Sequence, residues 1–329
     1  MALRPETRQV IGIALVLLVM CGVIAALVPE FRSARNLTNV LLHSAINCVL
    51  AVGMTFVILT AGIDLSVGAV MTLASAVMGV LLRDRFGGAL FAVAAALACG
   101  ALAGLVQGAV IVRWTVPPFI CTLGTMMAAR GLAEAVSKGE TIHGLPEQAL
   151  WLGGGSIATL VKAPPGATGG DLLLPVPVVL SLALVAVAHV MLTQTAFGRH
   201  VVAVGASEEA TRLAGVPVGW VKLTVYMICG ATGALAGVIA TGRMHAASPI
   251  IGKGAELEAI AAVVIGGTSL MGGRGTIVGS LIGALMMGVL RNALTLMNKP
   301  DRIQQIVIGC VIVFAVVLDQ VLRRRSARR

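Results

Sequence analysis

Long apolar runs recur from one end of the 329-residue chain to the other, and they constrain its fold more than any other feature. A helix needs about 20 such residues to cross the hydrocarbon core of a bilayer. Only 12% of the residues are charged, against about 25% in a typical soluble domain. The runs are solid rather than alternating, which favours helices over an outer-membrane barrel. We therefore predict an all-α polytopic membrane protein, with a single membrane domain over residues 1–329.

About ten membrane spans are expected along the chain. They are residues 10–28, 40–61, 65–82, 88–112, 117–136, 172–193, 221–241, 256–270, 275–293 and 303–322. An even number of spans puts both termini on one side of the membrane, and the arginine-rich C-terminal end places that side in the cytoplasm. A loop over about 194–220 would then be cytoplasmic, and a loop over about 137–171 would be external.

The net charge of +10 is explained by the membrane and does not require nucleic acid as a partner. Seven arginines cluster at the two ends of the chain, which is the distribution that the positive-inside rule describes. Other basic residues, among them Arg243, Lys253 and Arg291, fall at expected external positions. We expect them either to contact headgroups of membrane lipid or to face an acidic docking partner.

The expected cytoplasmic loop contains a short helix with recognisable signals at both ends. Ser207 is a suitable N-cap, and Glu208 and Glu209 fall in the first turn, where the helix dipole favours negative charge. Gly215 can adopt the left-handed conformation that ends a helix, and Pro217 prevents continuation. A short, rigid helix between two spans is predicted to be presented to a partner.

Polar groups within the spans are few, and they are the candidates for a translocation path. Arg130 and Glu134 are i, i+4 neighbours, so they are expected either to neutralise one another or to belong to that path. Amides suit a neutral polyhydroxyl solute better than an ion, although amides also join helices in lipid. The candidate path residues are Asn47, Asp64, Gln107, Thr125, Arg130, Asn292 and Gln304.

Glycine marks two short connections and several helix faces. The connections, 59–68 and 265–275, contain Asp64 and Arg274 and are expected to be tight turns at the surface, with a helix break inside the membrane as the alternative. Asp64 also stands where a carboxylate would cap the next helix. The glycine stripes, such as the one at Gly100 and Gly104, predict close packing between helices of the same chain.

The chain lacks the patterns that enzymes of the common classes carry. It has no GxxxxGK[ST] nucleotide-binding loop, no HExxH, no CxxC and no GxSxG, and its histidines are scattered. Its six cysteines lie in apolar runs and are expected to pack rather than to form disulfides. We therefore expect no catalytic residue, no metal and no cofactor on this chain.

Four sequence blocks carry a specific resemblance. They are GMTFVILTAGIDLSVGAV at 53–70, TVPPFICTLGTMMAARGLA at 115–133, FGRHVVAVGASEEATRLAGVPV at 197–218 and ELEAIAAVVIGGTSLMGGRGTIVGSLIGAL at 256–285. With these blocks the chain resembles, from about Asn36 to Asp319, the ribose-type sugar permeases of bacterial ATP-binding-cassette (ABC) importers. The blocks identify the family better than they identify the sugar.

The resemblance implies a vitamin-importer-like (type II) permease architecture in the bacterial inner membrane. It implies three protein partners: a second permease copy or a sister permease, a cytoplasmic tandem-cassette ATPase that binds ATP and Mg, and a periplasmic sugar-binding protein. The expected solute is a monosaccharide or related polyol. The alternatives are an ABC permease for a branched-chain amino acid or a nucleoside and, from another class, a stand-alone secondary transporter driven by an ion gradient.

The same resemblance assigns the capped helix as the coupling helix that docks on the ATPase. The residues implied in this coupling are Gly205, Ser207, Glu208, Glu209, Arg212, Leu213 and Gly215. Two stretches depart from the family pattern: Ala206-Ser207 precedes the acidic pair, and the stretch NKPDRIQQ at 298–305 is more charged than usual. The second departure lies where it would affect docking of a binding protein or the choice of sugar.

Overall fold

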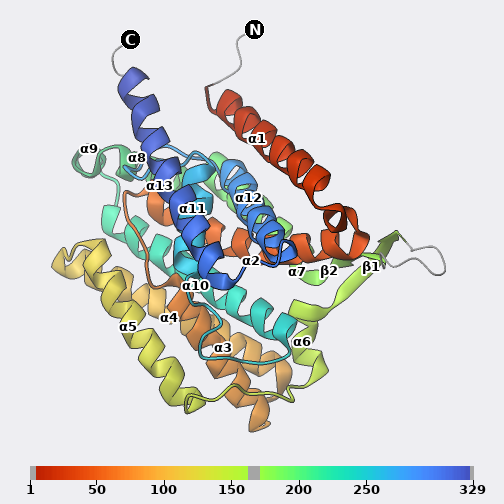
Figure 1. The fold of residues 1–329 in the computed structure, drawn as a ribbon. Helices are drawn as coiled ribbons and strands as arrows, with labels where there is room; N and C mark the ends of the chain where they lie inside the picture. Colours follow the sequence, from red (N-terminus) through yellow and green to blue (C-terminus); the bar gives the residue numbers. More distant parts are fainter. Residues whose placement is uncertain (1–4, 162–170, 327–329) are drawn as a thin grey trace.

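Helices dominate the structure, a computed structural model that describes residues 5–161 and 171–326. The first half contains α1 (Pro5–Leu27), a 3-10 turn η1 (Pro29–Arg32), α2 (Ala34–Leu59), α3 (Val67–Arg83), α4 (Gly88–Trp114), α5 (Pro118–Ser137) and α6 (Glu147–Gly154). The second half contains α7 (Val176–Gln194), α8 (Ala196–Ala206), α9 (Glu208–Leu213), α10 (Val218–Met244), α11 (Ala255–Ile265), α12 (Ile277–Leu296) and α13 (Asp301–Ser326). Figure 1 shows these helices gathered into one bundle.

Seven helices in the described part of the chain are long and apolar enough to cross a membrane, so the protein is a multi-pass membrane protein. They are α2, α4, α5, α7, α10, α12 and the Gln9–Leu27 part of α1. Each of the ten expected spans contains a helix, but three of these helices fall outside the seven. α3 is short at 17 residues, and α13 is not among the helices that are both long and apolar enough to cross a membrane. α11 has only 11 residues, because Gly266 and Gly267 end it, and Gly267 has a φ of 86°.

The centre of the bundle is formed by α2 and α10, which bury most of their residues. The main chains of α4 and α10 approach closely along the glycine stripe. A Cβ atom at Gly104 would lie 2.2 Å from the carbonyl oxygen of Tyr226, and one at Gly230 would lie 2.2 Å from that of Gly100. Any larger residue would push the two helices apart, so the prediction that the stripe packs within the chain is confirmed.

The connection between α2 and α3 is buried, contrary to the expectation of a turn at the surface. Asp64 is fully buried, and its carboxylate accepts hydrogen bonds from the backbone N–H and the hydroxyl of Ser66 (2.8 and 2.6 Å) and from Nε2 of Gln107 (2.7 Å). The N-cap of α3 is Ser66, and no side chain caps the N–H groups of its first turn, so Asp64 does not take the expected capping role. The bond to α4 explains the burial, because a buried carboxylate needs several donors.

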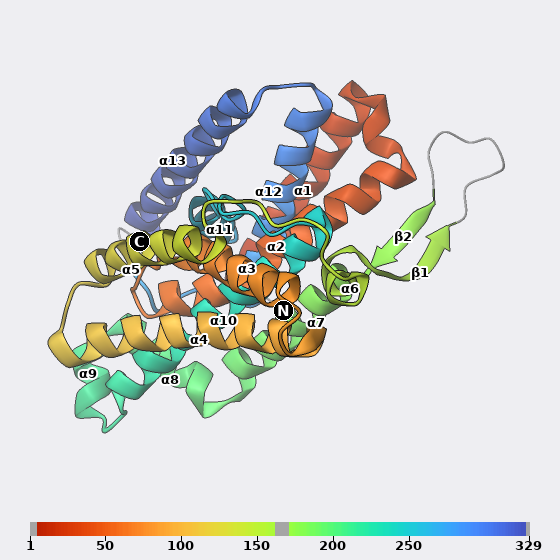
Figure 2. The same ribbon diagram turned by 90° about the horizontal axis from the view of Figure 1, so that it is seen from below.

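The expected external loop is not wholly irregular. It contains α6 and β1 (Ser156–Val161), which pairs with β2 (Leu172–Pro175), just beyond the loop, to form a two-stranded antiparallel hairpin. The hairpin corrects the expectation of an all-α chain, and it converts the start of the expected span 172–193 into a strand. Apolar and β-branched residues favour strands, and Pro175 ends the strand where α7 begins. In both Figure 1 and Figure 2 the hairpin projects from the side of the bundle.

Candidate functional site

A cavity of about 780 Å³ opens between six helices at one end of the bundle. Its walls come from the middle of α2, Met71 of α3, the C-terminal ends of α10 and α12, the N-terminal ends of α11 and α13, and the segment before α11. We call this region the cavity end. Cavities of this size are typical of sites that hold small molecules. Its polar lining residues are His43, Asn47, Arg243, Lys253, Glu258, Arg291, Asp301, Gln304 and Gln305.

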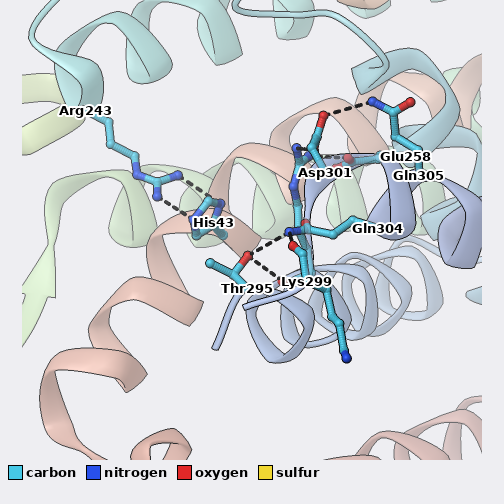
Figure 3. Close-up of polar contacts among 9 residues, drawn as sticks. His43, Arg243, Glu258, Thr295, Lys299, Asp301, Gln304 and Gln305 are labelled. Carbon is cyan, nitrogen blue, oxygen red and sulfur yellow. Dashed lines mark hydrogen bonds and ion pairs between the residues drawn. The ribbon is translucent and has the colours of Figure 1, made fainter. Parts of the chain in front are cut away.

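On one wall, α10 is joined to α2 through a guanidinium and an imidazole. Nη1 of Arg243 lies 3.0 Å from Nδ1 of His43, and Nη2 of Arg243 lies 2.5 Å from Nε2 of the same ring. A guanidinium can only donate, so the ring nitrogen that bonds to it accepts, and the imidazole is neutral. Figure 3 shows Arg243 reaching from its own helix to the ring of His43.

A second polar group joins α11, α12 and α13. Arg291 of α12 forms an ion pair with Glu258 of α11 and lies 3.9 Å from Asp301 of α13. Asp301 also accepts a hydrogen bond from Nε2 of Gln305 (3.0 Å), and Nε2 of Gln304 donates to the carbonyl of Lys299 (2.9 Å). Figure 3 shows this group apart from the Arg243–His43 pair. The charges here are compensated within the protein.

The seven candidate path residues do not form one site. Asn47 and Gln304 line the cavity. Asp64 and Gln107 bond to each other near the start of α3, and Asn292 forms a reciprocal amide pair with Asn36 (2.8 and 3.1 Å) that joins α12 to α2. The hydroxyl of Thr125 donates to the carbonyl of Cys121 within its own helix (3.1 Å).

Arg130 forms its ion pair with Glu256 rather than with Glu134. Nη2 of Arg130 lies 3.1 Å from Oε1 of Glu256, at the start of α11. Glu134 is exposed, whereas the side chain of Glu256 is only 9% exposed. A buried carboxylate loses more by lacking a partner than an exposed one, which explains why the long arginine side chain reaches α11.

The charged residues that line the cavity were not among the candidates. Arg243, Lys253 and Arg291 were expected to contact headgroups or an acidic partner, and His43 was expected to be an isolated histidine. One feature of the sequence could have indicated them: Arg243, Lys253 and Arg291 all fall at or near the expected external ends of spans. Sequence alone does not show that those ends converge.

The capped helix forms as predicted at the other end of the bundle. The hydroxyl of Ser207 accepts from the backbone N–H of Ala210 (3.3 Å), α9 runs from Glu208 to Leu213, and Gly215 has a φ of 82°. Leu213 is 84% exposed. The surface that α9 presents therefore combines an apolar side chain with the exposed charges of Glu209 and Arg212.

Glu208 differs from Glu209 because its carboxylate is paired with basic side chains of α9 and α10. Its carboxylate bonds to Nζ of Lys222 at 2.5 Å and to Nη2 of Arg212 at 2.9 Å. The hydrogen bond from Lys222 and the two positive charges lower the pKa of Glu208 below its usual value, against the opposing effect of burial. Glu208 therefore fastens α9 to the start of α10.

The helix α8 is joined to the bundle at Gly205 through main-chain contacts. A Cβ atom at Gly205 would lie 1.8 Å from the carbonyl oxygen of Leu59 and 2.5 Å from the nitrogen of Gly273. The N–H of Gly273 donates to the same carbonyl of Leu59 at 2.9 Å. The end of α8, the end of α2 and the turn between α11 and α12 thus meet at one point, which we call the glycine junction.

The glycine junction and the cavity lie at opposite ends of the same helices. Along α2, Leu59 is separated from His43 by 16 residues, about 24 Å of helix. Along α10, Lys222 beside α9 is separated from Arg243 by 21 residues, about 30 Å. In Figure 1, α8 and α9 lie at the upper left, away from the hairpin. We call the region of α8, α9 and the glycine junction the α9 end.

A multi-pass helical bundle with a solute-sized cavity at one end has the general plan of a membrane permease. The family model described as "Branched-chain amino acid transport system / permease component" matches residues 36–316. The chain therefore belongs to this permease family. No solved structure matches it.

Curated relatives extend over nearly the whole chain. It is 42% identical over 304 residues to the ribose import permease protein RbsC of Escherichia coli strain K12, covering 92% of this chain and 91% of the relative. It is 40% identical to the RbsC of Bacillus subtilis strain 168, covering 97% and 94%, and 40% identical to the fructose import permease protein FrcC of Rhizobium meliloti, covering 91% and 81%. These relatives confirm the prediction of a transport component rather than an enzyme.

Proposed function

We propose that this chain is the membrane subunit of an ABC importer that moves a monosaccharide or related polyol across the bacterial inner membrane. The observation that carries the proposal is the separation of the cavity from the capped helix α9 at the two ends of α2 and α10. The named solutes of the relatives, ribose and fructose, support the choice of a monosaccharide. The polar groups of the cavity supply donors and acceptors that a sugar needs.

The proposal includes the arrangement of the chain in the membrane. Both termini and the α9 end face the cytoplasm, the cavity end faces the periplasm, and ten helices cross the bilayer in the type II architecture. Under this arrangement a tandem-cassette ATPase, which binds ATP and Mg, docks on α9. A periplasmic sugar-binding protein docks at the cavity end, and a second copy or a sister permease completes the channel.

The proposed mechanism is alternating access. Closure of the ATPase cassettes moves α8 and α9, and the glycine junction passes this movement to α2 and to the turn between α11 and α12. These helices carry the residues that surround the cavity at their other ends. The chain itself makes and breaks no covalent bond, because its work is to change the side from which the cavity is reached.

The test is uptake by the organism that carries this gene. Cells with and without the gene are supplied with labelled D-ribose, L-arabinose and D-fructose, and with labelled leucine as the alternative solute class. We expect uptake of one sugar to be lost on deletion and restored by a plasmid copy. Unchanged uptake of every sugar, with loss of leucine uptake, would favour the branched-chain amino acid alternative and refute the sugar assignment.

A second measurement separates the importer from a secondary transporter. Collapse of the ion gradients with a protonophore, while ATP is maintained, should leave uptake of the sugar unchanged if an ATPase drives it. Depletion of ATP at a maintained gradient should stop it. The opposite pattern would assign the chain to the class of stand-alone transporters.

A further inference from the structure

Arg243 differs from three other arginines of the bundle in its partner. Arg130, Arg212 and Arg291 each pair with a carboxylate. No ion pair joins Arg243 to a carboxylate within residues 5–161 and 171–326, and its side-chain hydrogen bonds go to His43. An uncompensated cation on a membrane-protein wall costs free energy, and such residues usually serve a solute.

The location of Arg243 relates this charge to the cavity. Arg243 and His43 both line it, as does Asn47, which is one turn from His43 on the same face of α2. The guanidinium lies against both ring nitrogens of His43, but a neutral imidazole has one acceptor nitrogen, so one of the five N–H donors is used in a hydrogen bond to the ring. The remaining donors have no side-chain acceptor in the described part of the chain.

We propose that Arg243, held in place by His43, is a specificity-determining residue that binds two adjacent hydroxyl oxygens of the imported monosaccharide. This inference rests on the proposed function, and it names the subsite within the cavity. His43 is a positioning residue, because it orients the guanidinium and leaves its other edge for the sugar. The amide of Asn47 and the pair Glu258–Arg291 complete the polar wall.

The chemistry of a guanidinium favours this ligand class. Its donors lie in one plane at fixed spacing, so it can bind two neighbouring oxygen atoms at once, as it does in carboxylates. Adjacent hydroxyl groups of a sugar offer two such oxygen atoms. A lysine at the same position would keep the charge and lose the paired geometry, so Arg243→Lys separates the two properties.

The experiment replaces Arg243 in the gene of the host organism and measures the maximal rate of sugar uptake. The probes are D-ribose, L-arabinose and D-fructose, together with the monodeoxy derivatives of whichever sugar the unmodified chain imports. Loss of hydrogen bonds to a charged donor predicts a 10- to 100-fold lower rate for Arg243→Met with the parent sugar. Arg243→Lys should show a smaller loss, and His43→Gln, which keeps an acceptor, the smallest.

The deoxy sugars provide the decisive comparison. A derivative that lacks a contacted hydroxyl should be imported at nearly the same rate by the unmodified chain and by Arg243→Met. Arg83→Met is the matched control, because Arg83 pairs with Asp84 at the end of α3 and does not line the cavity. The abundance of each variant in the membrane is measured by immunoblot, so that rates refer to inserted protein.

The outcomes distinguish this inference from the proposed function. If the unmodified chain imports leucine and none of the sugars, the monosaccharide assignment fails. If it imports one, and Arg243→Met and Arg243→Lys slow the parent and every deoxy derivative by the same factor, the residue has a structural role and the contact is refuted. Rates equal to those of the Arg83→Met control would refute it as well.

Discussion

At the α9 end the main chains themselves are in contact, whereas at the cavity end residues of six helices surround about 780 Å³. The glycine junction leaves no room for a methyl group on Gly205. The cavity walls are instead joined by long, flexible side chains such as Arg243 and Arg291. The same helices, α2 and the α11–α12 pair, are thus joined rigidly at one end and loosely at the other. A movement applied at the rigid end therefore changes the shape of the loose end.

Replacement of Gly205 is the strongest test of the rigid end. We expect Gly205→Val to reduce sugar uptake about 10- to 100-fold, because its side chain would meet the backbone of Leu59 and Gly273 and force helices apart, a strain of about 1–3 kcal/mol. Gly124→Ala is the control, because a Cβ atom there has no neighbour within 4 Å. Uptake and membrane abundance are measured for both. Equal uptake by the two variants would show that the glycine junction transmits nothing.

The loose end is tested through the ion pair that joins α11 to α12. Arg291→Met leaves the carboxylate of Glu258, which is 12% exposed, without its main partner. We expect the variant to lose about 2 kcal/mol of stability, seen as a lower midpoint of thermal unfolding in detergent. The double variant Arg291→Met with Glu258→Gln should recover part of this loss, since no charge is left unpaired. If it is no more stable than Arg291→Met, the pair does not hold these helices together.

Leu213 tests what α9 contributes to a partner rather than to the fold. Leu213 is 84% exposed, so Leu213→Glu removes no buried contact and should leave folding unchanged. We expect about tenfold weaker association with the ATPase, measured by co-purification, because a charge buried in the contact without a partner costs free energy. Met297→Glu, at the far end of α12, provides a matched control for the added charge. Unchanged co-purification would remove Leu213 from the coupling surface.

The smallest expected effect is the pH dependence of α9. Because the pKa of Glu208 is lowered in the folded protein, its bond to Lys222 stabilises α9 above the usual carboxyl pKa. That stabilisation is lost as the pH falls through the lowered value. The partly exposed pair contributes about 1 kcal/mol or less. Protease sensitivity of α9 should therefore be higher in Lys222→Met than in the unmodified chain at pH 7, and this difference should disappear in acid.

The features that are local in sequence were predicted better than those that depend on long-range contact. The caps of α9 were predicted because Ser207 and Gly215 lie beside the helix that they delimit. The glycine stripe was also predicted, since its spacing repeats within one helix. Of the polar residues of the cavity only Asn47 and Gln304 were predicted, because residues such as Arg243 and His43 are separated by 200 positions. The amides chosen instead mostly join helices, as Asn292 does with Asn36.

The ion pair between Arg130 and Glu256 has a consequence for how the chain is made. The two residues are 126 positions apart, so α5 emerges from the ribosome long before α11 does. During that interval the guanidinium of Arg130 needs headgroups or water as partners, because an unpaired charge in the membrane is costly. Its long side chain allows it to reach them at the membrane surface. When α11 is synthesised, the guanidinium of Arg130 is already present to pair with the carboxylate of Glu256. The ion pair can therefore form only after α11 has been synthesised.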